Sequence, residues 1–142
     1  MIRKFNSKDT TKVMTIWTKG NFKAHSFIDR DYWIGNYNKV KNEYLLKSET
    51  YVYIDNKEIK GFISLVNDNY IGALFVSNDF KRKGIGRKLI NYCKEQKNKL
   101  TLNVYEKNIE AILFCVAMGF KNKEIKIDKE TGEKEYKLEW KE

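Results

Sequence analysis

The 142-residue chain is long enough for one domain with a hydrophobic core and too short for two ordinary ones, so we expect a single domain over residues 1–142. Hydrophobic residues make up 42% and charged residues 33%, which excludes a disordered chain. The net charge of +9 would suit a polyanionic partner, but the basic residues are scattered and no nucleic-acid motif appears, so a nucleic-acid partner is disfavoured.

The sequence also argues against a membrane or metal-dependent class of protein. No stretch approaches the roughly 20 apolar residues that cross a bilayer, and the N-terminal residues lack a signal-peptide segment. We therefore expect no membrane partner and a cytoplasmic location. Two cysteines, Cys93 and Cys115, fit neither a disulfide framework nor a paired metal motif, and one histidine argues against zinc, so we expect no metal.

The first part of the chain predicts a short strand followed by two helices. Residues 2–5 form the strand, and Ser7 or Asp9 caps a helix that ends at Gly20. Residues 21–27 are expected to form a loop. A second, longer helix begins at residues 29–31, and its apolar face consists of Trp33, Tyr37, Val40 and Tyr44.

From residue 51 the pattern changes to that of strands. Residues 51–55, 59–66 and 70–76 predict an antiparallel meander, and a helix then leads to a parallel strand at 100–104. Residues 109–118 are apolar on most sides, so we expect a mostly buried helix capped by Asn108 and Gly119. Strands at 120–127 and 135–140 close the chain around a turn at 129–133.

The loop between the strand at 70–76 and the next helix has the most distinct chemical character. Gly84 and Gly86 allow close backbone approach, and the N-terminus of the helix favours an anion. The surrounding cations are Lys81, Arg82, Lys83, Arg87 and Lys88. These features predict a pyrophosphate-like polyanion site, with a plain turn and solvated cations as the alternative. The spacing matches neither a Walker P-loop nor the dinucleotide fingerprint.

Two segments resemble motifs of the GNAT acetyltransferase superfamily. Residues 80–86, Phe-Lys-Arg-Lys-Gly-Ile-Gly, are similar to its coenzyme A pyrophosphate loop, Arg/Gln-x-x-Gly-x-Gly/Ala, with Lys81 in place of Arg or Gln. Residues 108–120 are similar to its second motif, Asn-x-x-Ala-x-x-Phe-Tyr-x-x-x-Gly-Phe. Residues 24–27 and a C-terminal hairpin are also similar to a subgroup of small bacterial single-domain GNAT proteins. The resemblance therefore covers nearly the whole chain.

The resemblance implies an α+β fold with a mixed, mostly antiparallel sheet of about six to seven strands, a central splayed parallel pair, and about four flanking helices. It also implies acetyl-CoA as co-substrate, with its pantetheine arm between the two parallel strands. The residues implied to bind this donor are Leu74, Phe75, Val76, Lys81, Arg82, Lys83, Gly84, Ile85, Gly86, Arg87, Lys88, Asn108 and Phe114. A helix cap is an equally good interpretation of Asn108.

The resemblance further implies that the Val76 amide polarises the thioester carbonyl while an amine attacks it directly. Cys115 stands where the family often has a tyrosine that protonates the leaving thiolate. A thiol, with an ordinary pKa of about 8.5, can donate a proton, but its short side chain would act through water. The alternatives are that Cys115 is a buried filler or that Tyr105 supplies the proton. Tyr105 is equally explained as a cover for the strand end.

A base must take the proton from an ammonium substrate. His25 is the best titratable candidate, because histidine titrates near neutrality and residues 24–27 border the acceptor site in the resembled subgroup. The alternative is a structural histidine. Asn103 is a candidate for orienting the acceptor or a water molecule. Phe27 and Trp33 are candidate walls of the acceptor pocket, with core packing as the alternative for Trp33.

We therefore expect an acetyl-CoA-dependent N-acetyltransferase that acts on a primary amine of a small molecule, peptide or protein. A non-catalytic acyl-CoA-binding module is the first alternative, suggested by the missing tyrosine and the lack of an evident base. A basic nucleic-acid-binding domain is the second, suggested by charge alone. Because superfamily members often dimerise through their late strands, a homodimer is a further expectation.

Overall fold

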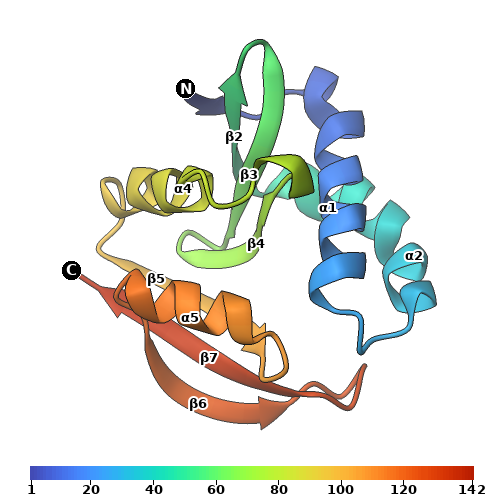
Figure 1. Cartoon of the computed structure of the whole chain (residues 1–142), viewed down its shortest axis with the longest axis vertical. Helices are drawn as coiled ribbons and strands as arrows, with labels where there is room; N and C mark the ends of the chain where they lie inside the picture. Colours follow the sequence, from blue (N-terminus) through green and yellow to red (C-terminus); the bar gives the residue numbers. More distant parts are fainter.

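The computed structural model describes residues 1–142 and shows one seven-stranded sheet with helices on both faces (Figure 1). The strands lie in the order β1-β2-β3-β4-β5-β7-β6. All neighbours are antiparallel except β4 and β5, which are parallel. The strand bounds are Ile2–Lys4 (β1), Glu49–Asp55 (β2), Glu58–Val66 (β3), Tyr70–Val76 (β4), Lys99–Tyr105 (β5), Lys121–Ile127 (β6) and Lys134–Lys141 (β7).

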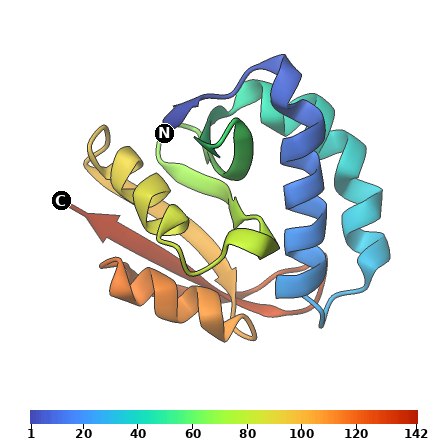
Figure 2. The ribbon, with the colours of Figure 1, turned by 45° about the horizontal axis from the view of Figure 1, so that its top comes forward.

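The main helices cover the sheet in two pairs, α1 with α2 on one face and α4 with α5 on the other (Figure 2). Their bounds are Thr10–Ala24 (α1), Arg30–Lys39 (α2), Ile85–Lys94 (α4) and Ile109–Ala117 (α5). Helix α2 continues through a π-helical turn, η2 (Val40–Tyr44), into the short α3 (Leu45–Lys47). Two 3-10 turns, η1 (Ser7–Asp9) and η3 (Asn78–Phe80), precede α1 and the glycine loop. None of the helices has the length and apolar character that a membrane crossing needs.

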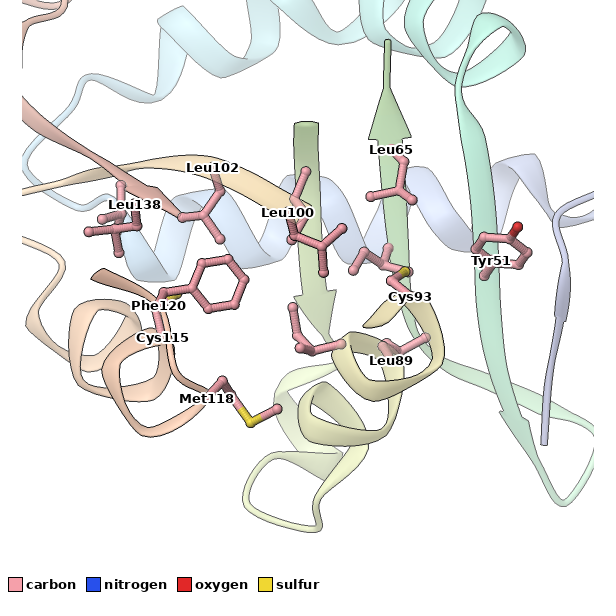
Figure 3. Close-up of a cluster of buried hydrophobic side chains, with 14 of the residues drawn as sticks. Tyr51, Leu65, Leu89, Cys93, Leu100, Leu102, Cys115, Met118, Phe120 and Leu138 are labelled. Carbon is pink, nitrogen blue, oxygen red and sulfur yellow. The ribbon is translucent and has the colours of Figure 1, made fainter. Parts of the chain in front are cut away.

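The sheet separates two hydrophobic cores, because side chains along a strand point alternately to opposite faces. On the α4/α5 face, Leu100 and Leu102 of β5 pack in one cluster with Leu89 of α4 (Figure 3). On the α1/α2 face, Trp17 of α1 packs in a second cluster with Phe62 of β3. Alternation along β5 therefore directs residues 101, 103 and 105 to the α1/α2 side.

This architecture confirms the α+β fold that the sequence predicts. The mixed sheet, its single parallel pair and its four main helices are all present. The meander from β2 to β4, the helix after Gly84 and the closing hairpin lie where the sequence places them.

Helix α1 continues past Gly20, so the expectation that Gly20 ends the helix and that residues 21–27 form a loop is wrong. The helix runs to Ala24, and His25 is its C-cap. Gly20 lies instead where β4 approaches α1. A Cβ atom at Gly20 would be 2.4 Å from Cδ1 of Phe75. The glycine therefore serves a close contact between helix and strand.

Helix α5 is less buried than its apolar sequence predicts. Its only fully buried residue is Cys115. Ile109, Leu113 and Val116 are 59%, 64% and 58% exposed, and their i, i+4, i+7 spacing makes them one outward stripe. The expectation of a mostly buried helix is wrong because the sheet covers one side of α5 and no other element covers the opposite side.

Replacing Gly20 by alanine tests the contact between α1 and β4. We expect Gly20→Ala to lower the free energy of unfolding by about 1–3 kcal/mol, because the added methyl group must displace the Phe75 ring. Gly35→Ala is the matched control, since Gly35 lies in α2 with no atom within 4 Å of its Cβ position. In this control the free energy of unfolding should rise by up to about 1 kcal/mol, because alanine has the higher helix propensity. Urea unfolding measures both changes, and equal effects would contradict the close contact.

Candidate active site

Strands β4 and β5 part soon after they pair. A single residue pair, Tyr70 with Thr101, joins them, and the Thr101 N–H donates to the Asn69 carbonyl at 3.0 Å. From Ile71 to Val76, the edge of β4 that faces β5 has no strand partner. The central parallel pair is therefore splayed, as the sequence interpretation expects.

Backbone groups of β4 point into this gap. The Ser77 N–H donates to the Lys60 carbonyl of β3 at 2.8 Å. Because the N–H groups of consecutive strand residues point to opposite edges, the N–H groups of Val76 and Leu74 point away from β3. They face the gap, where an extended ligand can pair with them as an added strand does.

The glycine loop joins β4 to the N-terminus of α4. Gly84 has φ +80° and Arg82 has φ +64°, so the chain turns twice through the left-handed region. The first helical hydrogen bond runs from the Lys88 N–H to the Gly84 carbonyl at 3.0 Å. The N–H groups of residues 85–87 therefore precede the helical ladder and can bind an anion. At Gly86 a Cβ atom would lie 3.3 Å from Cζ of Phe114, so a side chain there would crowd the loop.

The cations around this loop have no carboxylate partners. None of the five takes part in an ion pair of the structure; they are Lys81, Arg82, Lys83, Arg87 and Lys88. Positive charge without internal counterions, beside a helix N-terminus, favours a bound pyrophosphate. The loop thus fits the charged end of coenzyme A.

Aromatic side chains gather around His25 on the α1/α2 face of the sheet. The His25 ring stacks on Trp33 with ring centroids 5.3 Å apart. It meets Phe27 and Tyr105 edge-on, at 5.9 Å and 5.2 Å. The structure thus brings together four residues that the sequence analysis assigned to chemistry or acceptor binding, from the C-cap of α1, the following turn, α2 and β5.

The β6–β7 hairpin adds carboxylates to this aromatic cluster. The Tyr105 hydroxyl donates to Oδ2 of Asp128 at 2.7 Å, and the Tyr32 hydroxyl donates to Oε2 of Glu130 at 2.7 Å. Glu135 lies opposite Tyr105 in the β5–β7 register. Negative charge therefore gathers on the α1/α2 side of the gap, whereas the unpaired cations lie at the loop on the other side.

Comparison with known proteins agrees with this geometry. A sequence model described as "Acetyltransferase (GNAT) domain" matches residues 28–131. The chain belongs to the GNAT acetyltransferase family. The peptidyl-lysine N-acetyltransferase YiaC of Escherichia coli is 31% identical over 120 residues, which cover 84% of this chain and 82% of YiaC. The peptidyl-lysine N-acetyltransferase YjaB of Salmonella typhimurium is 29% identical over 121 residues, which cover 84% of this chain and 82% of YjaB.

Solved GNAT structures share the fold over the whole chain. The apo form of Escherichia coli YjaB has a TM-score of 0.86 at 24% identity, covering 99% of this chain and 96% of YjaB. The PaiA N-acetyltransferase of Thermoplasma acidophilum, in complex with coenzyme A, has a TM-score of 0.82 at 16% identity. The match covers 100% of this chain and 98% of PaiA. As a GNAT protein, the chain is an N-acetyltransferase that takes its acetyl group from acetyl-CoA.

Both ring nitrogens of His25 are already hydrogen-bonded within the GNAT domain. Asn21 donates through Nδ2 to the Trp17 carbonyl at 2.9 Å, so its Oδ1 accepts from His25 Nδ1 at 2.9 Å. The lone pair on His25 Nε2 then accepts from Asn108 Nδ2 at 3.3 Å. Burial lowers the pKa of His25 to about 4, so the ring is neutral near pH 7. Its role as a base stays a prediction, and this geometry favours a structural link between α1 and α5.

Asn108 is the N-cap of α5, as predicted, because its Oδ1 accepts from the Ala111 N–H at 3.3 Å. Its amide nitrogen donates to His25. Both ends of the side chain are therefore engaged within the protein. The predicted contact of Asn108 with the donor stays a prediction.

The two candidates for protonating the leaving thiolate have little freedom to do so. Cys115 is 4% exposed and lies in the core beside Phe120 and Met118 (Figure 3), where burial raises its pKa to about 11. Burial and the Asp128 carboxylate raise the pKa of Tyr105 above its ordinary value, which makes it a weaker acid. The catalytic roles of Cys115 and Tyr105 stay predictions, and their surroundings favour packing.

Tyr70 and Glu135, which no sequence motif indicates, lie near Asn103 on this side of the sheet. Asn103 Oδ1 is buried and has no hydrogen-bond partner in the protein. Burial and the charge of Glu135 raise the pKa of Tyr70, whereas hydrogen bonding from Asn103 lowers it. The alternating pattern of β7 predicts that Glu135 lies on the face opposite Leu138. Its position opposite Tyr105 depends on the strand register, for which the sequence carries no local signal.

The substitution Gly84→Ala tests the anion-binding loop. A side chain in the left-handed region costs about 1–2 kcal/mol. If the loop relaxes, the N–H groups of residues 85–87 turn away, so we expect the Kd for coenzyme A to rise about tenfold. Gly132→Ala is the matched control, because Gly132 has φ +76°, an open Cβ position and a place in the β6–β7 turn. Calorimetric titration with coenzyme A measures the Kd of each variant. The same Kd in the two variants would contradict the assignment of the loop as the anion site.

The lowered pKa of His25 predicts a pH-dependent stability. Its folded pKa of about 4 lies below the ordinary value of about 6.5, so the unfolded chain binds the proton more readily between these values. The stabilisation of the fold by the neutral, buried His25 ring is therefore fully present above about pH 6.5 and is lost as the pH falls towards 4.

Denaturant unfolding at pH 7 and pH 5 measures this effect. We expect the free energy of unfolding to fall by about 2 kcal/mol between these values, and His25→Gln to remove this contribution. The chain has one histidine, so an unchanged pH dependence in His25→Gln would show that the ring is not buried as a neutral group.

Proposed function

We propose that this GNAT protein acetylates the ε-amine of lysine residues in peptides or proteins. The observation that carries the proposal is the gap between β4 and β5, which has unpaired cations at the loop and carboxylates on the acceptor side. The relatives YiaC and YjaB are named peptidyl-lysine N-acetyltransferases. An acidic, aromatic surface suits a long aliphatic side chain that ends in a cation.

The donor binds through the loop and the gap. Its pyrophosphate contacts the N–H groups of residues 85–87 and the surrounding cations, and its pantetheine arm pairs with the backbone of Leu74 and Val76. The Val76 N–H, which points into the gap, then donates to the thioester carbonyl oxygen. This preplaced donor stabilises the negative charge that develops on that oxygen during attack.

The acceptor binds on the α1/α2 side, where Phe27 and Trp33 wall its path and Asn103 Oδ1 accepts an N–H of the amine. The deprotonated nitrogen attacks the carbonyl carbon, the new C–N bond forms and the C–S bond breaks. The nitrogen of the adduct loses its extra proton to solvent, and coenzyme A leaves as a thiolate that takes a proton from solvent. Holding donor and acceptor together in the gap converts an encounter in solution into a step within one complex.

A non-catalytic acyl-CoA-binding module is the second candidate. It is favoured by one observation, the burial of Cys115 at the position where the family often has a tyrosine acid. Such a module would keep the loop and the gap and would bind acetyl-CoA without turning it over.

Thiol release separates the two functions. We expect the protein to release coenzyme A from acetyl-CoA when a blocked pentapeptide with a central lysine is added, and mass spectrometry to show acetylation of that lysine. The control peptide has norleucine in place of lysine, so it keeps the aliphatic chain and lacks the amine. Binding of acetyl-CoA by calorimetry with no thiol release for any amine would favour the non-catalytic module.

A variant at Cys115 completes this test. We expect Cys115→Ala to keep the rate within a few-fold, because the thiol lies in the core and is not aimed at a hydrogen-bond partner. Loss of transfer with intact acetyl-CoA binding would instead assign the thiol a chemical role.

The expected homodimer and cytoplasmic location remain predictions of the sequence.

A further inference from the structure

Glu135 lies on β7, which borders β5 on the side away from the gap, at the level where β4 and β5 have parted. It pairs with Tyr105 in the β5–β7 register, and residues 100, 102 and 104 of β5 are buried on the opposite, α4/α5 face. Because paired residues share a face, Glu135 and Tyr105 both project to the acceptor side. The Glu135 side chain is only 14% exposed, so its carboxylate is mostly enclosed by protein.

Glu135 is also the carboxylate in this region that no protein hydrogen bond or short ion pair engages. Its one charged partner is Lys126, whose Nζ lies 3.8 Å from Oε1 and whose side chain is 42% exposed. The carboxylates of the turn between β6 and β7 are engaged: Asp128 by Tyr105 at 2.7 Å, Glu130 by Tyr32 at 2.7 Å, and Glu133 by Lys107 at 3.0 Å. A new proton can therefore bind Glu135 without breaking a strong contact.

The groups around Glu135 make its carboxylate more basic. Burial and the charge of Asp128 raise its pKa, and Lys126 lowers it. The ionisable groups that face it from the packed elements are Tyr70 of β4, Tyr105 of β5, Lys126 of β6, Asp128 of the hairpin and Tyr32 of α2. A carboxylate whose pKa moves towards neutrality is a better proton acceptor at physiological pH.

The acceptor side also provides a group that can hold the amine near this carboxylate. Asn103 Oδ1 is buried, accepts no hydrogen bond from the protein, and lies on β5 two residues before Tyr105. Tyr70, whose pKa responds to both Asn103 and Glu135, lies at the start of the gap. Asn103 and Glu135 therefore converge on one region of the acceptor face.

We infer that Glu135 is the general base of the transfer, taking a proton from the acceptor ammonium that Asn103 holds. This inference rests on the proposed lysine acceptor, whose amine is charged near pH 7. The proton passes from nitrogen to the Glu135 carboxylate, and the freed lone pair attacks the thioester carbon. The C–S electron pair leaves with sulfur as the thiolate, the nitrogen of the adduct gives its second proton to water, and the thiolate takes a proton from water. Glu135 then releases its own proton to solvent, so the reaction yields one amide, one thiol and one proton.

His25 is a weaker alternative on geometry. Its basic nitrogen already accepts a hydrogen bond from Asn108, and its other nitrogen donates to Asn21. Protonation would require Asn108 to turn and would disturb the cap of α5. Glu135 accepts a proton without either change.

The test is the pH profile of kcat/KM for Glu135→Gln, with acetyl-CoA and the blocked lysine pentapeptide. We expect a loss of about 10²- to 10³-fold at pH 7 with an unchanged KM for acetyl-CoA, because the base acts only on the acceptor. In the variant, the rate should rise about tenfold per pH unit towards the lysine pKa of about 10.4, since only the neutral amine then reacts. A purely structural role would not produce this change in slope.

Glu139→Gln is the matched control. Glu139 lies on the same strand and face but pairs with Lys99 and Lys141, each at 3.7 Å, away from the gap. It should keep the wild-type rate within about twofold and the wild-type pH profile. A Glu135→Gln variant that behaves like Glu139→Gln overturns the inference.

Carbon-13 NMR titration of the Glu135 carboxyl group in the wild-type protein provides a second test, which needs neither an acceptor nor a folded variant. An apparent pKa above the ordinary glutamate value supports the role, and a value at or below it overturns the role. Failure of the wild-type protein to acetylate the lysine peptide, with a raised Glu135 pKa, would reject the proposed acceptor and keep Glu135 as the base for another amine.

Discussion

The parting of β4 and β5 after one residue pair is the constraint on which the rest of the structure depends. A parted pair leaves polar backbone groups of β4 without strand partners, which is costly unless a ligand or water binds them. The two halves of the sheet are held elsewhere, by the β2–β4 meander on one side and by the β5–β7 pairing on the other. Hydrophobic clusters on both faces then hold the halves together around the gap.

The same gap separates two charge environments. The glycine loop collects cations without carboxylate partners, whereas the β6–β7 hairpin brings carboxylates and tyrosines to the other side. The net charge of +9 therefore conceals an uneven distribution, with unpaired cations at the glycine loop and carboxylates at the β6–β7 hairpin.

Local signals predicted the strand, the turn and the helix cap that form the proposed donor side. The apolar run of β4, the glycines and the cap at Asn108 each depend on neighbouring residues in the chain, so the sequence contains them. The acceptor side depends on contacts between distant segments. The approach of Phe75 to Gly20, the hydrogen bonds that occupy His25 and the register that places Glu135 opposite Tyr105 each join residues far apart in sequence. Such contacts leave no periodic pattern, so the sequence alone did not bring Glu135 forward beside His25 as a candidate base.

Burial of the two cysteines has a practical consequence for work on this enzyme. Cys93 and Cys115 are 1% and 4% exposed, and burial raises the pKa of both thiols. Thiol-specific reagents react with the thiolate, so the native protein should consume them slowly. A colorimetric reagent can therefore follow released coenzyme A continuously, and a sudden rise in its background would report unfolding of the α4/α5 core during the assay.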